Sequence, residues 1–215
     1  MQSNKETAEK VAEFLLQIKA IQLNKSTPFQ WASGWQSPIY CDNRKTLSYP
    51  KVRTYIRQKY VDTIQENFGQ VDVIAGVATG GIAQGALVAQ DLELPLVYVR
   101  SASKGHGLQN QIEGDVSPGQ RVVVIEDLIS TGMSSLKAVQ ALREAGCHVV
   151  GMIAIFTYGF QVALDNFSAY QCPLYTLSNY DELVDVALAK EYITQEDIIS
   201  LKSWRQDPAN WSVYA

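Results

Sequence analysis

The chain has 215 residues, of which 47% are hydrophobic and 19% charged, and its formal net charge is -4. This composition suits one compact domain with a sizeable core. The acidic balance argues against nucleic-acid binding, because a broad grip on phosphates needs clustered Lys and Arg. No apolar run approaches the roughly 20 residues that span a bilayer, and the N-terminus lacks the pattern of a secretion signal. We therefore expect a cytoplasmic protein that binds neither nucleic acid nor membranes.

The chain contains three cysteines and two histidines. Cys41, Cys147 and Cys172 are widely spaced and form no CxxC pair, which indicates reduced thiols rather than a disulfide framework or a zinc site. Two histidines are too few for an imidazole metal cage. The sequence therefore predicts no metal site built from protein ligands.

Residues 1–45 carry two local patterns. Ser3 and Glu6 form a capping-box pattern ahead of a helical periodicity that continues to about Ala20. From Phe29 to Tyr40 the aromatic residues, a Ser-Gly step and a Ser-Pro step predict a short hairpin. We interpret residues 1–45 as an N-terminal helix and a hood on a single domain that spans residues 1–215.

The rest of the chain alternates between apolar runs and helical patterns. A helix is predicted to begin at Pro50, and others at residues 82–89, 134–145, 181–192 and 195–204. The apolar, β-branched runs are 71–77, 96–99, 121–125 and 149–156. This alternation predicts an α/β fold, a doubly wound and mostly parallel sheet with helices on both faces. Ligands of such sheets bind beyond the carboxyl ends of the strands.

The strongest motif is the segment VVVIEDLISTGMSS, which begins at Val122. Glu126 and Asp127 end its buried run, and carboxylates accept hydrogen bonds well from the paired hydroxyls of a ribose. A turn that can direct N–H groups and hydroxyls at a phosphate follows. It consists of Ser130, Thr131, Gly132, Met133 and Ser134. Taken alone, an acid pair at a strand end can also simply cap the next helix.

Two further loops follow apolar runs. Thr79 and Gly80 open a helix and can offer N–H groups to a pyrophosphate, although Gly-rich turns of this kind also occur for steric reasons alone. The loop after Val99 is long and polar, and it carries Arg100, Lys104 and His106. Such donors can close over a departing pyrophosphate and neutralise its charge, whereas the alternative is a merely solvated basic loop.

These motifs resemble the type I phosphoribosyltransferases. The mobile-loop segment KGHG and the hood segment SGWQSPIYCDNR further resemble the orotate phosphoribosyltransferases within that group. The resemblance implies transfer of the phosphoribosyl group of phosphoribosyl pyrophosphate (PRPP) to orotate, giving orotidine 5′-phosphate in pyrimidine (UMP) biosynthesis. It also implies Mg²⁺ bound mainly through the pyrophosphate donor, and a homodimer with shared active sites.

The resemblance also implies roles for individual residues. Glu126 and Asp127 fall on the ribose-binding acids, and the turn at residues 130–134 falls on the 5′-phosphate site. The implied catalytic residues are Arg100, Lys104, His106 and Asp127. The implied base pocket contains Tyr40, Arg44 and Tyr158, with Arg44 facing the orotate carboxylate. The sequence departs from some members at Ala32, Gly80 and Ser101, where those members have lysines.

Three alternatives remain at this stage. The acceptor could be a purine or another pyrimidine, because the donor motif is shared and the hood selects the base. The chain could instead be a non-catalytic PRPP-binding regulator, although it carries no added segment for reading DNA. It could also be a pyrophosphokinase-like or structural relative that has merely inherited the motif.

Overall fold

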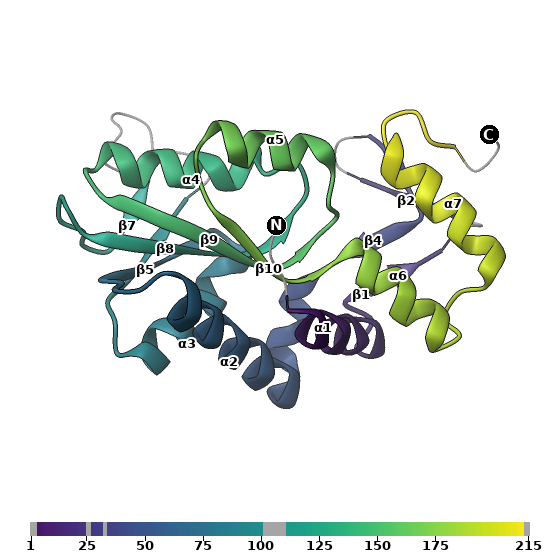
Figure 1. Ribbon diagram of the computed structural model, residues 1–215, viewed down its shortest axis with the longest axis horizontal. Helices are drawn as coiled ribbons and strands as arrows, with labels where there is room; N and C mark the ends of the chain where they lie inside the picture. The colour runs from purple at the N-terminus through teal and green to yellow at the C-terminus, as the bar shows by residue number, and fades with distance from the viewer. Residues whose placement is uncertain (1–3, 25–26, 32–33, 101–110, 213–215) are drawn as a thin grey trace.

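One central sheet lies between two layers of helices in the computed structural model, which describes residues 4–24, 27–31, 34–100 and 111–212 (Figure 1). The helices are α1 (Lys5–Gln17), η1 (Asn43–Ser48), α2 (Pro50–Asn67), α3 (Gly80–Leu92), α4 (Met133–Glu144), α5 (Gln161–Ala169), α6 (Tyr180–Ala189) and α7 (Gln195–Gln206). The strands are β1 (Ile21–Leu23), β2 (Phe29–Gln30), β3 (Gln36–Ser37), β4 (Ile39–Cys41), β5 (Val73–Val77), β6 (Leu96–Val99), β7 (Ile112–Glu113), β8 (Arg121–Ile129), β9 (His148–Thr157) and β10 (Leu174–Asn179).

The main sheet has the strand order β10-β9-β8-β5-β6-β7, and only β7 runs antiparallel to its neighbour. The predicted α/β fold class with a mostly parallel sheet is therefore confirmed. Because the parallel strands end at one edge, the loops after β5, β6 and β8 meet there. β7 and β10 were not predicted, since each has polar residues within a short apolar pattern.

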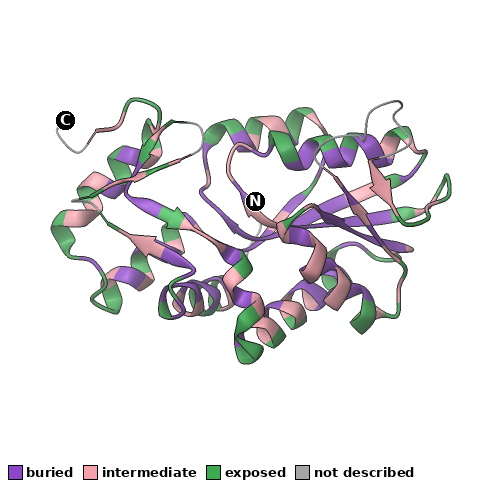
Figure 2. Cartoon of the chain, turned by 180° about the vertical axis from the view of Figure 1, so that it is seen from behind, coloured by how far each residue is buried: buried purple, intermediate pink, exposed green. Residues whose placement is uncertain are grey.

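The two faces of the sheet have separate cores. Helices α4 and α5 cover one face, and α1, α2 and α3 cover the other (Figure 1). Val122 and Val124 of β8 belong to the first core, whereas Val123 and Ile125 belong to the second, as the alternation of a strand requires. The central strands of the main sheet are largely buried, whereas the helices keep exposed outer faces (Figure 2). Among the helices described, none is long and apolar enough to cross a membrane.

Several predicted boundaries need correction. Asn4 caps α1, because its side chain accepts a hydrogen bond from the Thr7 N–H, and the helix ends at Gln17 before Lys19 adopts a positive φ. The capping-box residue Ser3 lies outside the described residues. Helix α5 was missed. By contrast, the capping box of α7, formed by Thr194 and Asp197, is confirmed.

The hood contains two short antiparallel pairs. β2 pairs with β3, which confirms the predicted hairpin, and β1 pairs with β4. These strands lie beside α6 and α7, at the end of the molecule away from β7 (Figure 1). Trp204 of α7 is fully buried and donates its indole N–H to the backbone oxygen of Gln36 at 3.2 Å. The last helix of the chain therefore holds the hairpin in place.

Candidate active site

A polar cavity of about 410 Å³ opens where β5 and β8 end. Its walls include Val77, Ala78, Thr79, Gly80, Val99, Arg100, Glu126, Asp127, Leu128 and Ser134, together with Cys41, Asp42 and Arg44 of the hood. The acid pair, the turn after β5 and the first residue of the long loop are thus brought together as the sequence predicts. One boundary differs, because β8 continues to Ile129 and so includes both acids. The longer β9 keeps pairing with β8 beyond the end of β5.

Glu126 is almost fully buried, with 6% of its surface exposed. Its carboxylate accepts hydrogen bonds from the Ser135 hydroxyl at 2.7 Å and from the Asp127 N–H at 2.9 Å. Burial, followed by the negative charge of Asp127, raises the pKa of Glu126 well above its usual value. Its carboxyl group is therefore held in a fixed orientation at the base of the cavity.

Asp127 is half-buried and projects toward the start of α3. A Cβ atom built on Gly80 would lie only 2.4 Å from either carboxylate oxygen of Asp127. Residue 80 therefore has to be glycine for Asp127 to occupy this position.

The turn at residues 130–134 joins β8 to α4. Gly132 has φ +80°, and a Cβ atom there would lie 2.6 Å from the Phe167 ring. Asn166 donates a hydrogen bond to the Thr131 backbone oxygen at 2.9 Å. Met133 and Ser134 are exposed at the N-terminus of α4, where free N–H groups and the helix dipole favour an anion.

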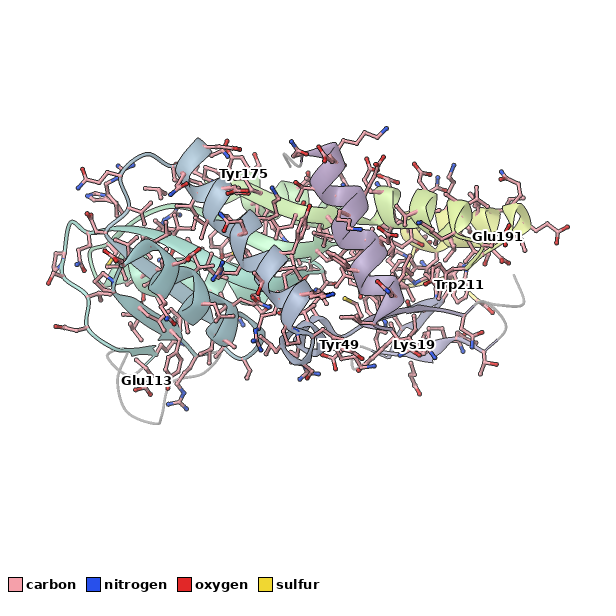
Figure 3. The ribbon with its side chains drawn as sticks, turned by 90° about the horizontal axis from the view of Figure 1, so that it is seen from below. Lys19, Tyr49, Glu113, Tyr175, Glu191 and Trp211 are labelled. Carbon is pink, nitrogen blue, oxygen red and sulfur yellow. The ribbon has the colours of Figure 1, made fainter. Side chains whose placement is uncertain are left out.

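The remaining predicted donor contacts come from β5 and β6. Thr79 is exposed directly before α3, and the Ala78–Thr79 peptide bond is cis. Arg100 lines the cavity and lies 3.3 Å from Glu113 of β7. Glu113 and Glu191 lie toward opposite ends of the molecule, so Arg100 is remote from the α6–α7 end (Figure 3). Lys104 and His106 lie outside the described residues.

A second cavity of about 570 Å³ adjoins the first and has mainly aromatic walls. Two of its lining residues, Cys41 and Leu128, also line the first cavity. The others are Gln30, Trp31, Trp35, Tyr40, Ser130, Thr131 and Tyr158. A ligand that reaches from one cavity into the other would therefore pass Cys41 and Leu128.

Tyr158 is the most deeply buried aromatic residue of this second cavity, with 2% exposed surface. Its ring lies 5.0 Å from that of Trp31 and 5.7 Å from that of Trp204. Burial raises the pKa of Tyr158 well above its usual value, so the phenol stays neutral. The predicted pair Tyr40 and Tyr158 is thus brought together in one cavity.

Arg44 belongs to the hood and lies at the edge of the site. It lines the first cavity, not the aromatic one, and its Nε donates to Asp42 at 2.7 Å. The pKa of Asp42 is lowered chiefly by this hydrogen bond. The described residues that line the aromatic cavity include no Arg or Lys. Arg44 thus borders the first cavity, while Tyr40 and Tyr158 border the adjoining aromatic one.

Sequence reasoning left several residues of the site unassigned, among them Trp31, Trp35, Cys41 and Leu128. Trp31 and Trp35 were open to interpretation as ordinary hairpin packing, and Cys41 as a small buried residue. Leu128 lies inside the acidic motif and was treated only as an apolar spacer. The signal that could have found it is its position next to Asp127 in an extended strand, which places its side chain on the opposite face.

Comparison with known proteins agrees with this geometry. Residues 45–191 match the family model described as the phosphoribosyl transferase domain. The chain is 61% identical over 200 residues to an orotate phosphoribosyltransferase of Bacteroides thetaiotaomicron, covering 93% of this chain and 94% of the relative. It is 57% identical over 203 residues to that of Listeria innocua, with 94% and 97% covered.

The fold comparison gives the same family. The crystal structure of orotate phosphoribosyltransferase from Aeropyrum pernix superposes with a TM-score of 0.74 at 27% identity, covering 86% of this chain and 99% of that one. The matched domain includes the acid pair, the turns at residues 79–80 and 130–134, and Tyr158. This chain belongs to the orotate phosphoribosyltransferase family, within the phosphoribosyl transferase domain proteins.

Proposed function

We propose that the chain transfers the phosphoribosyl group of PRPP to orotate, giving orotidine 5′-phosphate and pyrophosphate in UMP biosynthesis. The observation that carries this proposal is the junction of two unlike cavities. One is polar and contains the acid pair, whereas the other is aromatic, and they share Cys41 and Leu128. A sugar diphosphate suits the first, and a planar base suits the second. The reaction would take place where they meet.

The donor is proposed to lie along the carboxyl end of β8. Asp127 and Glu126 accept hydrogen bonds from the ribose hydroxyls, and the turn at residues 130–134 donates N–H and hydroxyl groups to the 5′-phosphate. Thr79 and Gly80 face the pyrophosphate. Support comes from the common cavity that Thr79, Gly80, Glu126, Asp127 and Ser134 line.

The base is proposed to enter the aromatic cavity. Tyr40 and Tyr158 offer ring faces to the planar orotate, and Trp31 extends the same wall. Because no cation lines this cavity among the described residues, Arg44 would have to meet the orotate carboxylate from the adjoining donor cavity. Residues 1–45 would thus act as the base-binding hood of a single domain.

The chemical step is a displacement at the anomeric carbon of the ribose. The bond from this carbon to the pyrophosphate oxygen breaks, a ring nitrogen of orotate forms the new bond, and the electron pair leaves with pyrophosphate. Positive charge grows on the sugar near Asp127, while negative charge grows on the leaving group near Arg100, Lys104 and His106. Catalysis then depends on positioning and electrostatics and needs no covalent intermediate.

Mg²⁺ is proposed to bind mainly through the pyrophosphate of the donor, whose charge it would neutralise. The carboxylate of Asp127 borders the same cavity and is a hard oxygen ligand of the kind that Mg²⁺ prefers. The described residues contain no group of three or more His, Cys, Asp or Glu arranged to hold a metal. We place this reaction in the cytoplasm.

The test is a panel of acceptors. Purified protein with PRPP and Mg²⁺ is given orotate, uracil, hypoxanthine or adenine, and loss of base and release of pyrophosphate are followed together. We expect consumption with orotate only. Consumption of a purine or of uracil would assign a different acceptor. PRPP binding by calorimetry without turnover of any base would identify a regulator instead.

The proposed oligomer is a homodimer in which Lys104 and His106 of one subunit serve the site of the other. Mixing Asp127→Asn with Lys104→Ala protein tests this arrangement, because a mixed dimer has one site in which both residues are intact. Random exchange should then restore about one quarter of wild-type activity. The same mixture would stay inactive if each subunit supplied its own Lys104.

A further inference from the structure

Two side chains from outside the sheet contact the backbone of the acid pair. Tyr60 of α2 is fully buried, and its hydroxyl donates a hydrogen bond of 2.6 Å to the backbone oxygen of Glu126. Asn43 of η1 is 1% exposed, and its side-chain amide donates one of 2.6 Å to the backbone oxygen of Asp127. Neither residue belongs to a sequence motif that we assigned to the binding of PRPP.

These contacts reach β8 just beyond the point where its pairing with β5 ends. The last pair between β5 and β8 joins Gly76 to Ile125, so the next backbone groups of β8 on that side need other partners. On the opposite side, β8 stays paired with β9 as far as Ile129 and Thr157.

The hydrogen bonds from Tyr60 and Asn43 hold the backbone of Glu126 and Asp127, and this backbone determines where the two carboxylates point. Consecutive side chains of a strand project to opposite faces. Glu126 accordingly meets Ser135 of α4, and Asp127 meets Gly80 of α3. A rotation of the peptide between Glu126 and Asp127 would move both carboxylates away from these positions.

We propose that Tyr60 is a positioning residue for the donor-binding acids, with Asn43 as its counterpart on the other side of the strand. Tyr60 does not line the cavity and acts through the backbone of Glu126. This inference rests on the proposed function, because it assumes that Glu126 and Asp127 hold the ribose of PRPP.

Tyr60 is the donor in its hydrogen bond to the Glu126 backbone oxygen. Burial, with the charges of Asp127 and Glu126, raises the pKa of Tyr60 well above its usual value. The hydroxyl therefore stays protonated and donates to the carbonyl throughout the pH range in which the enzyme would be assayed.

The test compares Tyr60→Phe with Tyr180→Phe. Tyr180 is a matched control, since it is also buried and its hydroxyl donates to a backbone oxygen, that of Leu201, at 3.0 Å. Each substitution leaves a buried carbonyl without its partner, so both should lower the melting temperature. Only Tyr60→Phe should weaken Mg²⁺–PRPP binding in calorimetry, by about tenfold, as expected for misplaced binding groups.

The kinetic readout separates positioning from general destabilisation. In Tyr60→Phe the KM for PRPP should rise while the KM for orotate changes less than twofold, and Asn43→Ala should show the same split. Wild-type affinity for PRPP in folded Tyr60→Phe would overturn the inference alone. The same holds if Tyr180→Phe loses affinity equally. Failure of the wild-type protein to bind PRPP would overturn the proposed function as well.

Discussion

The two cavities of the site are built in different ways. The walls of the donor cavity come largely from short segments at the carboxyl ends of β5 and β8, and their backbone is positioned by the sheet. The aromatic cavity depends on residues far apart in the chain, such as Trp31 of the hood and Tyr158 after β9. Trp204 of α7 supports both of these rings.

This difference predicts how substitutions in each cavity should affect binding and stability. In the donor cavity, a change should affect the binding of one chemical group while the fold survives, because the sheet is stabilised by separate cores on its two faces. In the aromatic cavity, the same rings provide both the wall and the packing of the hood. Changes there should alter stability and base binding together.

The largest expected effect is that of Asp127→Asn. Two hydrogen bonds from ribose hydroxyls to a carboxylate contribute about 2 kcal/mol each, so kcat/KM should fall roughly a thousandfold. Steady-state kinetics and PRPP calorimetry measure this loss. Asp165→Asn on the exposed face of α5 is the control and should behave as wild type. Unchanged donor binding in Asp127→Asn would contradict the ribose assignment.

Substitutions of the adjacent residues Gly80 and Gly81 should affect different properties, PRPP binding in the first case and stability in the second. A Cβ atom on Gly81 would lie 2.3 Å from the Ile125 backbone oxygen, which cannot move, so Gly81→Ala should lower the free energy of unfolding by about 3 kcal/mol. The three atoms nearest to a Cβ atom on Gly80 all belong to the Asp127 carboxylate, which can rotate away. Gly80→Ala should therefore retain most of its stability but lose PRPP affinity. Denaturant unfolding and calorimetry distinguish the two outcomes.

Trp204→Phe probes the aromatic cavity. The substitution removes the hydrogen bond to Gln36 and part of a fully buried ring, so we expect a loss of about 2 kcal/mol in the free energy of unfolding. The KM for orotate should rise more than that for PRPP. Phe68→Leu is the control, because the Phe68 ring is buried and packs on Tyr175 of β10. It should lower stability without raising the KM for orotate more than the KM for PRPP. Equal changes in both KM values would show that the two cavities are not separable.

The smallest effect is expected from the pH dependence of Glu126. Because its pKa is raised in the folded protein, the carboxyl group favours folding at low pH, and this contribution is lost as the pH rises through the folded-state pKa. Glu126→Gln should therefore melt higher than wild type at pH 8 by about 2 to 4 °C, or roughly 1 kcal/mol. The difference should disappear near pH 4. A constant difference across this range would argue against a buried charge.

Much of the donor cavity was predictable because its residues are close in the chain. The strand β6 has the bounds that the sequence predicts, and the segment from Glu126 to Ser134 places the acids and the phosphate turn in one motif. Parallel strands then bring Thr79 to the same edge. Local periodicity and turn chemistry were sufficient for these predictions.

The sequence by itself determined the α/β class, the acid pair, the turn at residues 130–134 and the hairpin of the hood, because each depends on neighbouring residues. Only the tertiary structure decided that β8 extends through the acids, that Arg44 lies in the donor cavity, and that Tyr60 contacts Glu126, 66 positions away in the chain. Such contacts depend on which surfaces pack together. No periodicity along the chain records that choice, since packing joins residues without regard to their separation in sequence.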